Sequence, residues 1–434
     1  MFSHSGSLPV PPGRRRAVVA ACLGNGIEWY DFALYTGLAT VLSAVLTPGG
    51  WDGFLTVFAV FALSCLFRPL GSLFVGVRAD TLGRRPALAA MILLMSAATA
   101  GIGLLPPWQL IGVVAPVCLL GLRAVQAFSA GGEIGVSVAY LIEVSPPGER
   151  GRYGQWYIGT VAAGFAAGLG VSALLAATLG PAQFHAWGWR IPFLVALPLG
   201  AVGVYLRRGQ VESLELREPA QPIRPLRVLA EHGPTVRRSF LIAGAYSATF
   251  SVWFLFLPSY LTSTGVTSLV SALLSALAGL VAAAVAAPWF GRVSDAVGRR
   301  RVLVGAAASL TVAAVPLYLW MSGGSALATG TGSVVIGVIL GAFVLPAFLA
   351  EQFPMRVRAT GLGLAYGIGS AVIGGTAPLV ATLLARNAPT AAVPAYLAVW
   401  AVMALVAIIR SPETAPAITV AAFDSGPAFR SMSA

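Results

Sequence analysis

Residues 76–85 read Gly-Val-Arg-Ala-Asp-Thr-Leu-Gly-Arg-Arg, and residues 291–300 read Gly-Arg-Val-Ser-Asp-Ala-Val-Gly-Arg-Arg. Both stretches fit the pattern Gly-x3-Asp-x2-Gly-Arg-Arg. A second pattern, Glu-x2-Pro-x3-Arg, begins at Glu143 and again at Glu351. The first pair is offset by 215 residues and the second by 208, in the same order along the chain. Two motifs repeated at nearly one offset predict two halves of common architecture.

Long apolar blocks surround these repeats. Of the 434 residues, 57% are hydrophobic and 10% are charged, whereas soluble proteins are about 25% charged. A helix needs about 20 apolar residues to cross a bilayer, and each half contains six such blocks. We therefore predict an all-α membrane protein with twelve transmembrane helices in two pseudo-symmetric six-helix bundles. The blocks begin near Ala17, Trp51, Pro86, Gln109, Tyr153, Ile191, Phe240, Val266, Arg301, Ala326, Thr360 and Ala391.

The blocks divide the chain into five parts. Residues 1–16 are predicted to be a cytoplasmic N-terminus, and residues 17–206 the N-terminal bundle. Residues 207–239 form a cytoplasmic linker that is too short for a domain. Residues 240–410 form the C-terminal bundle, and residues 411–434 a disordered cytoplasmic tail.

The positive charge of the chain indicates topology. All 27 basic residues are arginines, and the formal net charge is +12. Almost all of them fall in loops on one side of the predicted helices, which places both termini in the cytoplasm of a multi-pass cell-membrane protein. The same distribution excludes a nucleic-acid partner. Cys22, Cys65 and Cys118 lie singly in apolar blocks, so we expect no metal site, and we expect no cofactor.

The first apolar block holds the most specific motif, Gly24-Asn25-Gly26-Ile27-Glu28-Trp29-Tyr30-Asp31-Phe32-Ala33-Leu34-Tyr35. It resembles the signature of the metabolite:proton symporter family, a branch of the major facilitators that imports organic acids, betaines and related metabolites with protons. Parallel six-helix halves are also how major facilitators are built. Residues 68–71, 123–133 and 351–361 agree with the family, whereas Thr81 and Ala127 depart from it. The resemblance implies proton-coupled import of a small molecule by alternating access.

Charged groups inside predicted helices are the candidates for proton coupling. Such a group costs about 2.5–3.5 kcal/mol on insertion scales, so it indicates function. Burial disfavours a charged carboxylate and a nearby arginine favours it, so a pair that forms in one conformation and separates in another can bind and release a proton. The resemblance implies this role for Asp31 with Arg123; a static interhelical pair is the alternative. Glu28 and Glu133 are further candidate acids.

Substrate contacts are predicted from the remaining arginine and from aromatic residues near it. Arg68 is expected either to neutralise a substrate carboxylate or to pair with a nearby acid. The arginines favour an organic acid, while a betaine-like zwitterion stays open. The predicted substrate-binding residues are Arg68, Trp29, Tyr30, Tyr35, Gln126, Trp253 and Tyr366.

The repeated loops predict a cytoplasmic gate. An acid at a helix end attracts the positive N-terminal dipole of a helix in the other half, and this contact must break in each transport cycle. The predicted gate residues are Asp80, Gly83, Arg84, Arg85, Glu143, Arg150, Asp295, Arg299, Arg300, Glu351 and Arg358. Glycines in the fifth helix, Gly164 among them, permit close helix approach.

The sequence argues against three other classes of protein. The chain has no lysine, so it lacks the P-loop of an ATP-driven pump. An intramembrane enzyme lacks support, because neither HExxH nor GxSxG is present. A proton-antiport exporter of drugs or natural products is the main alternative, but the fifth predicted helix lacks the proline usual in such exporters. The predicted partners are a small-molecule substrate, protons and the lipid bilayer, and the chain is expected to function as a monomer.

Overall fold

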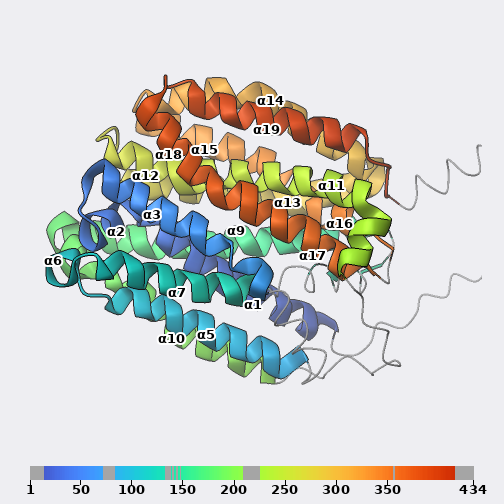
Figure 1. The fold of residues 1–434 in the computed structure, drawn as a ribbon. Coiled ribbons are helices and arrows are strands. Elements are labelled where there is room, and N and C mark those ends of the chain that lie inside the picture. Colours follow the sequence, from blue (N-terminus) through green and yellow to red (C-terminus); the bar gives the residue numbers. More distant parts are fainter. Residues whose placement is uncertain are drawn as a thin grey trace, which may run out of the picture.

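The computed structural model describes residues 14–71, 84–131, 138, 141, 142, 145, 146, 148–208, 225–354 and 357–415. The helices lie side by side with their long axes roughly parallel, the first half below the second in Figure 1. Large apolar side chains such as Val285, Val312 and Leu327 are exposed on the outside of the bundle. Exposed apolar side chains around a bundle indicate contact with lipid.

The first half runs from α1 to α10. Its helices are α1 (Arg14–Gly37), α2 (Ala39–Leu46), α3 (Gly50–Cys65), α5 (Arg84–Leu104), α6 (Trp108–Ile111), α7 (Val114–Gly131), α9 (Arg150–Gln183), the π-helix η1 (Phe184–Gly188) and α10 (Arg190–Arg208). Helices α1 and α2 form one bent pair, with an angle of 61° between Asn25–Gly37 and Ala39–Leu46.

The second half runs from α11 to α19. Its helices are α11 (Pro225–Phe250), the π-helix η2 (Ser251–Phe256), α12 (Leu257–Ser263), α13 (Leu269–Val297), α14 (Arg299–Ser322), α15 (Ala326–Gly341), α16 (Leu345–Glu351), α17 (Arg358–Gly369), the π-helix η4 (Ser370–Gly374), α18 (Gly375–Asn387) and α19 (Ala392–Ile409). Helix α11 begins inside the predicted linker and departs from helical geometry at His232.

Nine helices in the described part of the chain are long and apolar enough to span a membrane, and the bent pair makes ten. Two shorter apolar stretches, Ala90–Leu104 and Arg190–Tyr205, belong to helices α5 and α10. Together these helices match the order of the twelve predicted apolar blocks. The all-helical fold predicted from the sequence is therefore confirmed.

Local sequence explains where several helices begin and end. Ser268 and Ser325 cap α13 and α15, each accepting a hydrogen bond from a backbone N–H three residues later. Gly298 has φ +107° and joins α13 directly to α14. Only glycine adopts this backbone conformation without strain, which explains the glycine of the second Gly-x3-Asp-x2-Gly-Arg-Arg motif.

The two halves meet along α9 and α13, which pack against each other over much of their length. Within the first half, α1 packs on α9, and a Cβ atom at Gly164 would collide with the backbone of Gly26. The predicted close approach at this glycine is confirmed. The interface between the halves encloses the candidate site.

Candidate substrate cavity and proton site

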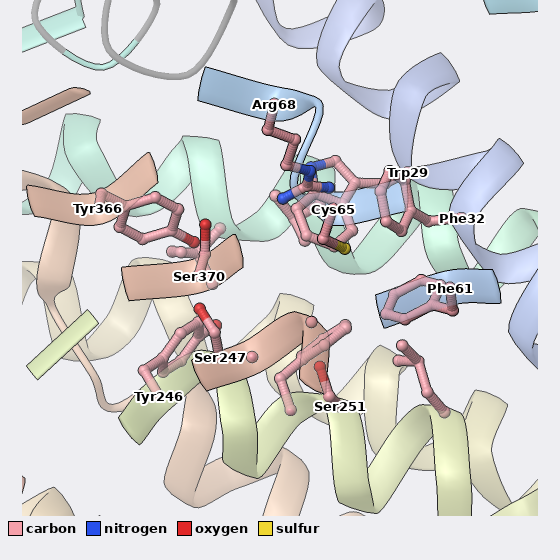
Figure 2. Close-up of a pocket in the computed structure, with 16 residues that line it drawn as sticks. Trp29, Phe32, Phe61, Cys65, Arg68, Tyr246, Ser247, Ser251, Tyr366 and Ser370 are labelled. Atoms are coloured by element: carbon pink, nitrogen blue, oxygen red, sulfur yellow. The ribbon is translucent and has the colours of Figure 1, made fainter. Parts of the chain in front are cut away.

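A cavity lies between the two halves, with about 580 Å³ of atom-free space. Figure 2 shows its walls, which come from α1, α3 with the segment after it that holds Arg68, and α9 on one side. The other side comes from α11, η2, α17, η4 and α18. The lining residues are Trp29, Phe32, Phe61, Cys65, Arg68, Ile158, Val161, Tyr246, Ser247, Phe250, Ser251, Leu255, Tyr366, Ser370, Gly374 and Gly375.

Two π-helical segments supply part of this lining. Ser251 and Leu255 belong to η2, and Ser370 and Gly374 belong to η4. A π-turn widens a helix and breaks the regular i to i−4 hydrogen bonding, and such turns recur at functional sites. The widened turns occur where the second half faces the cavity, a feature that the sequence pattern does not reveal.

Arg68 is the one charged residue among the described residues that line the cavity. Its side chain is largely buried, and its guanidinium lies 4.6 Å from the centroid of the Phe32 ring. Within the described part of the chain, its Nε makes no hydrogen bond. Across the cavity, the Tyr366 hydroxyl interacts with Ser247 and lies within electrostatic range of Arg68 and Glu28. A cationic donor therefore faces hydroxyl groups across a ring-lined space.

Asp31 and Arg123 form a second, fully buried cluster behind this wall. Asp31 is 0% and Arg123 1% exposed. Thr99 and Arg123 are the polar groups that act on the Asp31 carboxylate, but neither of its oxygens makes a well-formed hydrogen bond within the described residues. Arg123 donates from Nη1 to Gln126 (2.8 Å), and Gln126 donates to the Thr99 hydroxyl. The arginine and the acid are thus close but not paired.

Aromatic rings enclose Arg123. Its guanidinium carbon lies 4.3 Å from the Tyr35 ring centroid, 5.1 Å from that of Phe32 and 5.2 Å from that of Phe61. A guanidinium within about 6 Å of a ring centroid gains cation–π stabilisation. The rings therefore supply part of the stabilisation that water would otherwise give to this buried charge.

The structure places the predicted substrate-binding residues in two groups. Trp29, Arg68 and Tyr366 line the cavity. The remaining four lie outside its lining. The Tyr30 hydroxyl donates to the Pro192 carbonyl (2.8 Å), the Tyr35 hydroxyl donates to the Val57 carbonyl (2.7 Å), Gln126 belongs to the Arg123 cluster, and Trp253 packs edge-on against Tyr318 at 6.0 Å between ring centroids.

Glu28, a predicted proton-coupling acid, is buried one turn before Asp31 on α1. Glu133, the other predicted acid, lies outside the described residues. The sequence interpretation missed Phe32 and Phe61 as wall residues. A signal for Phe32 was present, because it follows Trp29 by three positions and shares its helix face.

At the end that the arginine distribution assigns to the cytoplasm, a charged cluster joins the halves. We call Gly151, Arg152, Asp295, Arg299 and Glu351 the cytoplasmic cluster. The Asp295 carboxylate accepts hydrogen bonds from the backbone N–H groups of Gly151 and Arg152, both at 2.9 Å. These amides open α9 of the other half, where the helix dipole is positive. Arg299, 0% exposed at its side chain, pairs with Asp295 (2.6 Å) and Glu351 (3.3 Å).

Glu413, just after the last helix, extends this cluster. Its carboxylate accepts from the backbone N–H groups of Arg299 (2.8 Å) and Arg300 (3.1 Å), which open α14. Nothing in the spacing of the repeats indicates this contact. Among the other predicted gate residues, Arg150 acts electrostatically on Glu351, and Arg358 donates from Nε to the Ala350 carbonyl (2.9 Å). Asp80, Gly83, Glu143 and the side chains of Arg84 and Arg85 lie outside the described part of the chain.

Contacts also join the halves at the opposite end, and we call these the outer contacts. The Ser259 hydroxyl donates to the Thr36 carbonyl (2.9 Å), and Arg386 pairs with Asp52 (2.8 Å). Rings meet there as well: Trp51 with Tyr260, and Phe54 and Phe58 with Phe256, at 6.2–6.4 Å between centroids. The cavity thus lies between two sets of contacts that join the halves.

Two helical halves with a cavity at their interface and breakable contacts at both ends define a secondary transporter. The Major Facilitator Superfamily model matches residues 17–378. The chain belongs to that superfamily and, within it, to the metabolite:proton symporter family. It is therefore a multi-pass membrane transport protein and not an enzyme.

Several known proteins are similar over most of their length. The proline/betaine transporter of Escherichia coli is 34% identical over 420 residues, covering 92% of this chain and 84% of that protein. The glycine betaine/proline/ectoine/pipecolic acid transporter OusA of Dickeya dadantii matches with the same identity and coverage. The ectoine/proline transporter ProP of Corynebacterium glutamicum is 32% identical over 431 residues, covering 93% and 85%.

Solved structures agree with the fold. The proton:xylose symporter XylE bound to 6-bromo-6-deoxy-D-glucose superposes with a TM-score of 0.72, covering 92% of this chain and 96% of that one at 16% identity. The inward open xylose transporter XylE from E. coli gives a TM-score of 0.67 at 16% identity, covering 92% and 97%.

Proposed function

We propose that this protein imports a small zwitterionic carboxylate, of the betaine or proline type, together with protons. The observation that carries the proposal is the cavity in which Arg68, with a free Nε donor among the described residues, faces a space lined by aromatic rings. A guanidinium binds a carboxylate, and aromatic rings attract a quaternary or secondary ammonium. The relatives named as proline, betaine and ectoine transporters support the same substrate class.

The ring content of the cavity favours a zwitterion over a plain organic acid, the substrate that the arginines alone favoured. Trp29 and Phe250 meet edge-to-face across the two halves at 5.7 Å between centroids, close to Phe32 and Phe61 in the same lining. A dicarboxylate would bring a second negative charge against these rings with no second lining cation among the described residues. A substrate with one carboxylate and one ammonium group can place the carboxylate against Arg68 and the ammonium group against the aromatic rings.

Proton coupling is assigned to Asp31 and Arg123. In the present structure the arginine is held among rings and the acid lacks a well-formed hydrogen bond. We propose that Arg123 leaves the rings for Asp31 when the cytoplasmic end opens, which stabilises the carboxylate and releases the proton inside. The chain is oriented with both termini in the cytoplasm, as its arginines predict.

The first test is the direction of proton movement when substrate is supplied. Purified protein in liposomes containing a pH-sensitive dye would meet glycine betaine, proline, ectoine, lactate and benzoate in turn. We expect internal acidification with at least one of the first three. Acidification with lactate or benzoate alone would assign an organic acid instead, and alkalinisation would support the antiport exporter.

Two substitutions test the assigned residues. Asp31→Asn should abolish accumulation of radiolabelled substrate against a gradient while exchange across the membrane continues, because exchange needs no net proton transfer. Asp52→Asn, at an exposed acid, is the matched control. Arg68→Gln should raise the KM at least tenfold, and Arg68→Lys less. Full accumulation by Asp31→Asn would remove that residue from the mechanism.

A further inference from the structure

The ring of Phe32 is shared by two arginines that serve different sites. Arg68, in the cavity wall, lies 4.6 Å from its centroid, and Arg123, beside Asp31, lies 5.1 Å from the same centroid. The two guanidinium carbons are therefore separated by no more than the sum of these distances. Phe61 meets Phe32 edge-to-face at 6.0 Å and contacts Arg123 as well.

The same two rings form the wall between the cavity and the proton site. Phe32 and Phe61 line the cavity (Figure 2), yet each also contacts the buried Arg123. Phe32 follows Asp31 directly in α1, so any motion of this turn moves the acid and the wall together. Two like charges at this separation in a poorly solvated environment act strongly on each other and on any nearby anion.

We infer that Phe32 is a positioning residue that couples substrate binding to proton binding. It holds Arg68 and Arg123 close to each other, and the substrate carboxylate and Asp31 compete for the positive electrostatic potential of these two arginines. This inference rests on the proposed function. When a substrate carboxylate binds Arg68, its negative charge weakens the positive potential at Asp31. The ionised form of Asp31 is then less stabilised, so Asp31 binds a proton that enters with the substrate. The coupling is reciprocal. When Asp31 is protonated and neutral, the two arginines attract the substrate carboxylate more strongly, and the substrate binds more tightly.

Spare donors support this arrangement. Within the described residues, Arg68 Nε and Arg123 Nε and Nη2 make no hydrogen bond. Both guanidinium groups therefore have N–H donors available to bind an anion while they remain packed against the rings. The other ionisable groups that face these two sites among the described residues are Glu28, Tyr30 and Tyr35 of α1, Cys65 of α3, Tyr246 of α11 and Tyr366 of α17.

The transport test compares Phe32→Leu, Phe32→Tyr and Phe193→Leu in liposomes. The probes are radiolabelled glycine betaine, for uptake, and an internal pH dye, for protons. Phe32→Leu fills the wall but removes the π-face, and we expect the ratio of protons to glycine betaine to fall at least threefold while exchange continues. Phe32→Tyr should keep the wild-type ratio. Phe193→Leu, which removes an equally buried ring that contacts neither Arg68 nor Arg123 and lies outside the outer contacts, should also keep it. An unchanged ratio in Phe32→Leu would overturn the inference.

A second measurement needs no substrate. Infrared titration follows the protonated carboxyl band that is lost in Asp31→Asn. If Arg68 and Asp31 share a field through Phe32, Arg68→Gln should shift the midpoint of this titration by about one pH unit, a tenfold change in proton affinity. In a Phe32→Leu background the shift should fall below half of that. Equal shifts in both backgrounds would refute the role of Phe32 even if the substrate proposal held.

Discussion

Replacing Asp295 by Asn tests the cytoplasmic cluster. The carboxylate accepts two backbone hydrogen bonds from the start of α9, each at 2.9 Å, and pairs with Arg299 at 2.6 Å. An Asn has one acceptor oxygen, so at least one backbone N–H of the other half loses its partner. We expect the equilibrium to shift toward conformations that are open at this end.

The magnitude follows from the contacts that are lost. One hydrogen bond to a charged group contributes about 1.5–3 kcal/mol, and the attraction of a carboxylate to a helix N-terminus adds about 0.3–1 kcal/mol. The side chain of Asp295 is 12% exposed, so solvent screening is modest. A net loss of about 2–3 kcal/mol changes the ratio of closed to open conformations by roughly 30- to 150-fold.

The assay is a distance measurement between spin labels on the two halves. Gly148→Cys and Arg301→Cys place labels near the starts of α9 and α14, and a Cβ at Gly148 meets no atom within 4 Å. The native cysteines would be replaced first. Asp295→Asn should move the distribution to longer distances, and Asp52→Asn, at the opposite end, should not. An Asp295→Asn distribution that matches the parent within twofold in populations would refute the reasoning.

Three other substitutions follow from the geometry. Gly164→Val should lower the thermal stability of detergent-solubilised protein by several degrees, because even a Cβ collides with the neighbouring helix, whereas Gly363→Ala, which meets open space, should not. Arg386→Gln should change stability by less than about 1 kcal/mol, because its pair with Asp52 is 43% and 79% exposed; a larger loss in a denaturation series would contradict this. Glu413→Gln should speed protease cleavage after residue 415, since the carboxylate holds the start of α14; equal cleavage rates would count against that restraint.

The helices could be predicted from the sequence because a membrane-spanning segment is recognised by its length and its apolar composition. Each apolar block must satisfy its backbone internally, which leaves a helix as the outcome. An ionisable residue within such a block is costly, and the predicted ones that the structure describes are buried, whereas the burial of Arg299 in a loop-flanking motif was not predicted. Asp31, Arg68 and Arg123 are all buried, as their positions in the blocks predict.

Side-chain direction and tertiary contacts were harder to predict. Tyr30 and Tyr35 occupy the same motif as Trp29, yet both hydroxyls bond to backbone carbonyls outside the cavity. The bend after α1 and the π-turns at η2 and η4 rotate helix faces by amounts that no ideal periodicity gives. Glu413 reaches α14 across more than a hundred residues of sequence. Such contacts depend on the packed fold rather than on local pattern.

The two ends of the cavity are closed by different chemistry. The cytoplasmic cluster uses buried charges, chiefly the two hydrogen bonds that Asp295 accepts, at about 1.5–3 kcal/mol each. The outer contacts comprise one neutral hydrogen bond from Ser259 at about 1 kcal/mol and ring contacts at about 0.5–1.5 kcal/mol each. The exposed pair of Arg386 with Asp52 adds less than about 1 kcal/mol.

The contacts at the two ends therefore contribute similar free energies of closure, and alternating access requires this balance. If one end were closed several kcal/mol more firmly than the other, the carrier would remain in a single conformation at any realistic substrate concentration, because a ligand shifts an equilibrium only by its differential affinity. The difference in chemistry then makes the two ends separately adjustable. Charge substitutions act mainly on the cytoplasmic end, because the one ion pair among the described outer contacts is exposed, whereas changes of ring size act on the outer end. Arg68 and Arg123 lie between the two ends of the cavity. A proton or a substrate that binds there changes the local charge, and a modest change of this kind is enough to select which end opens.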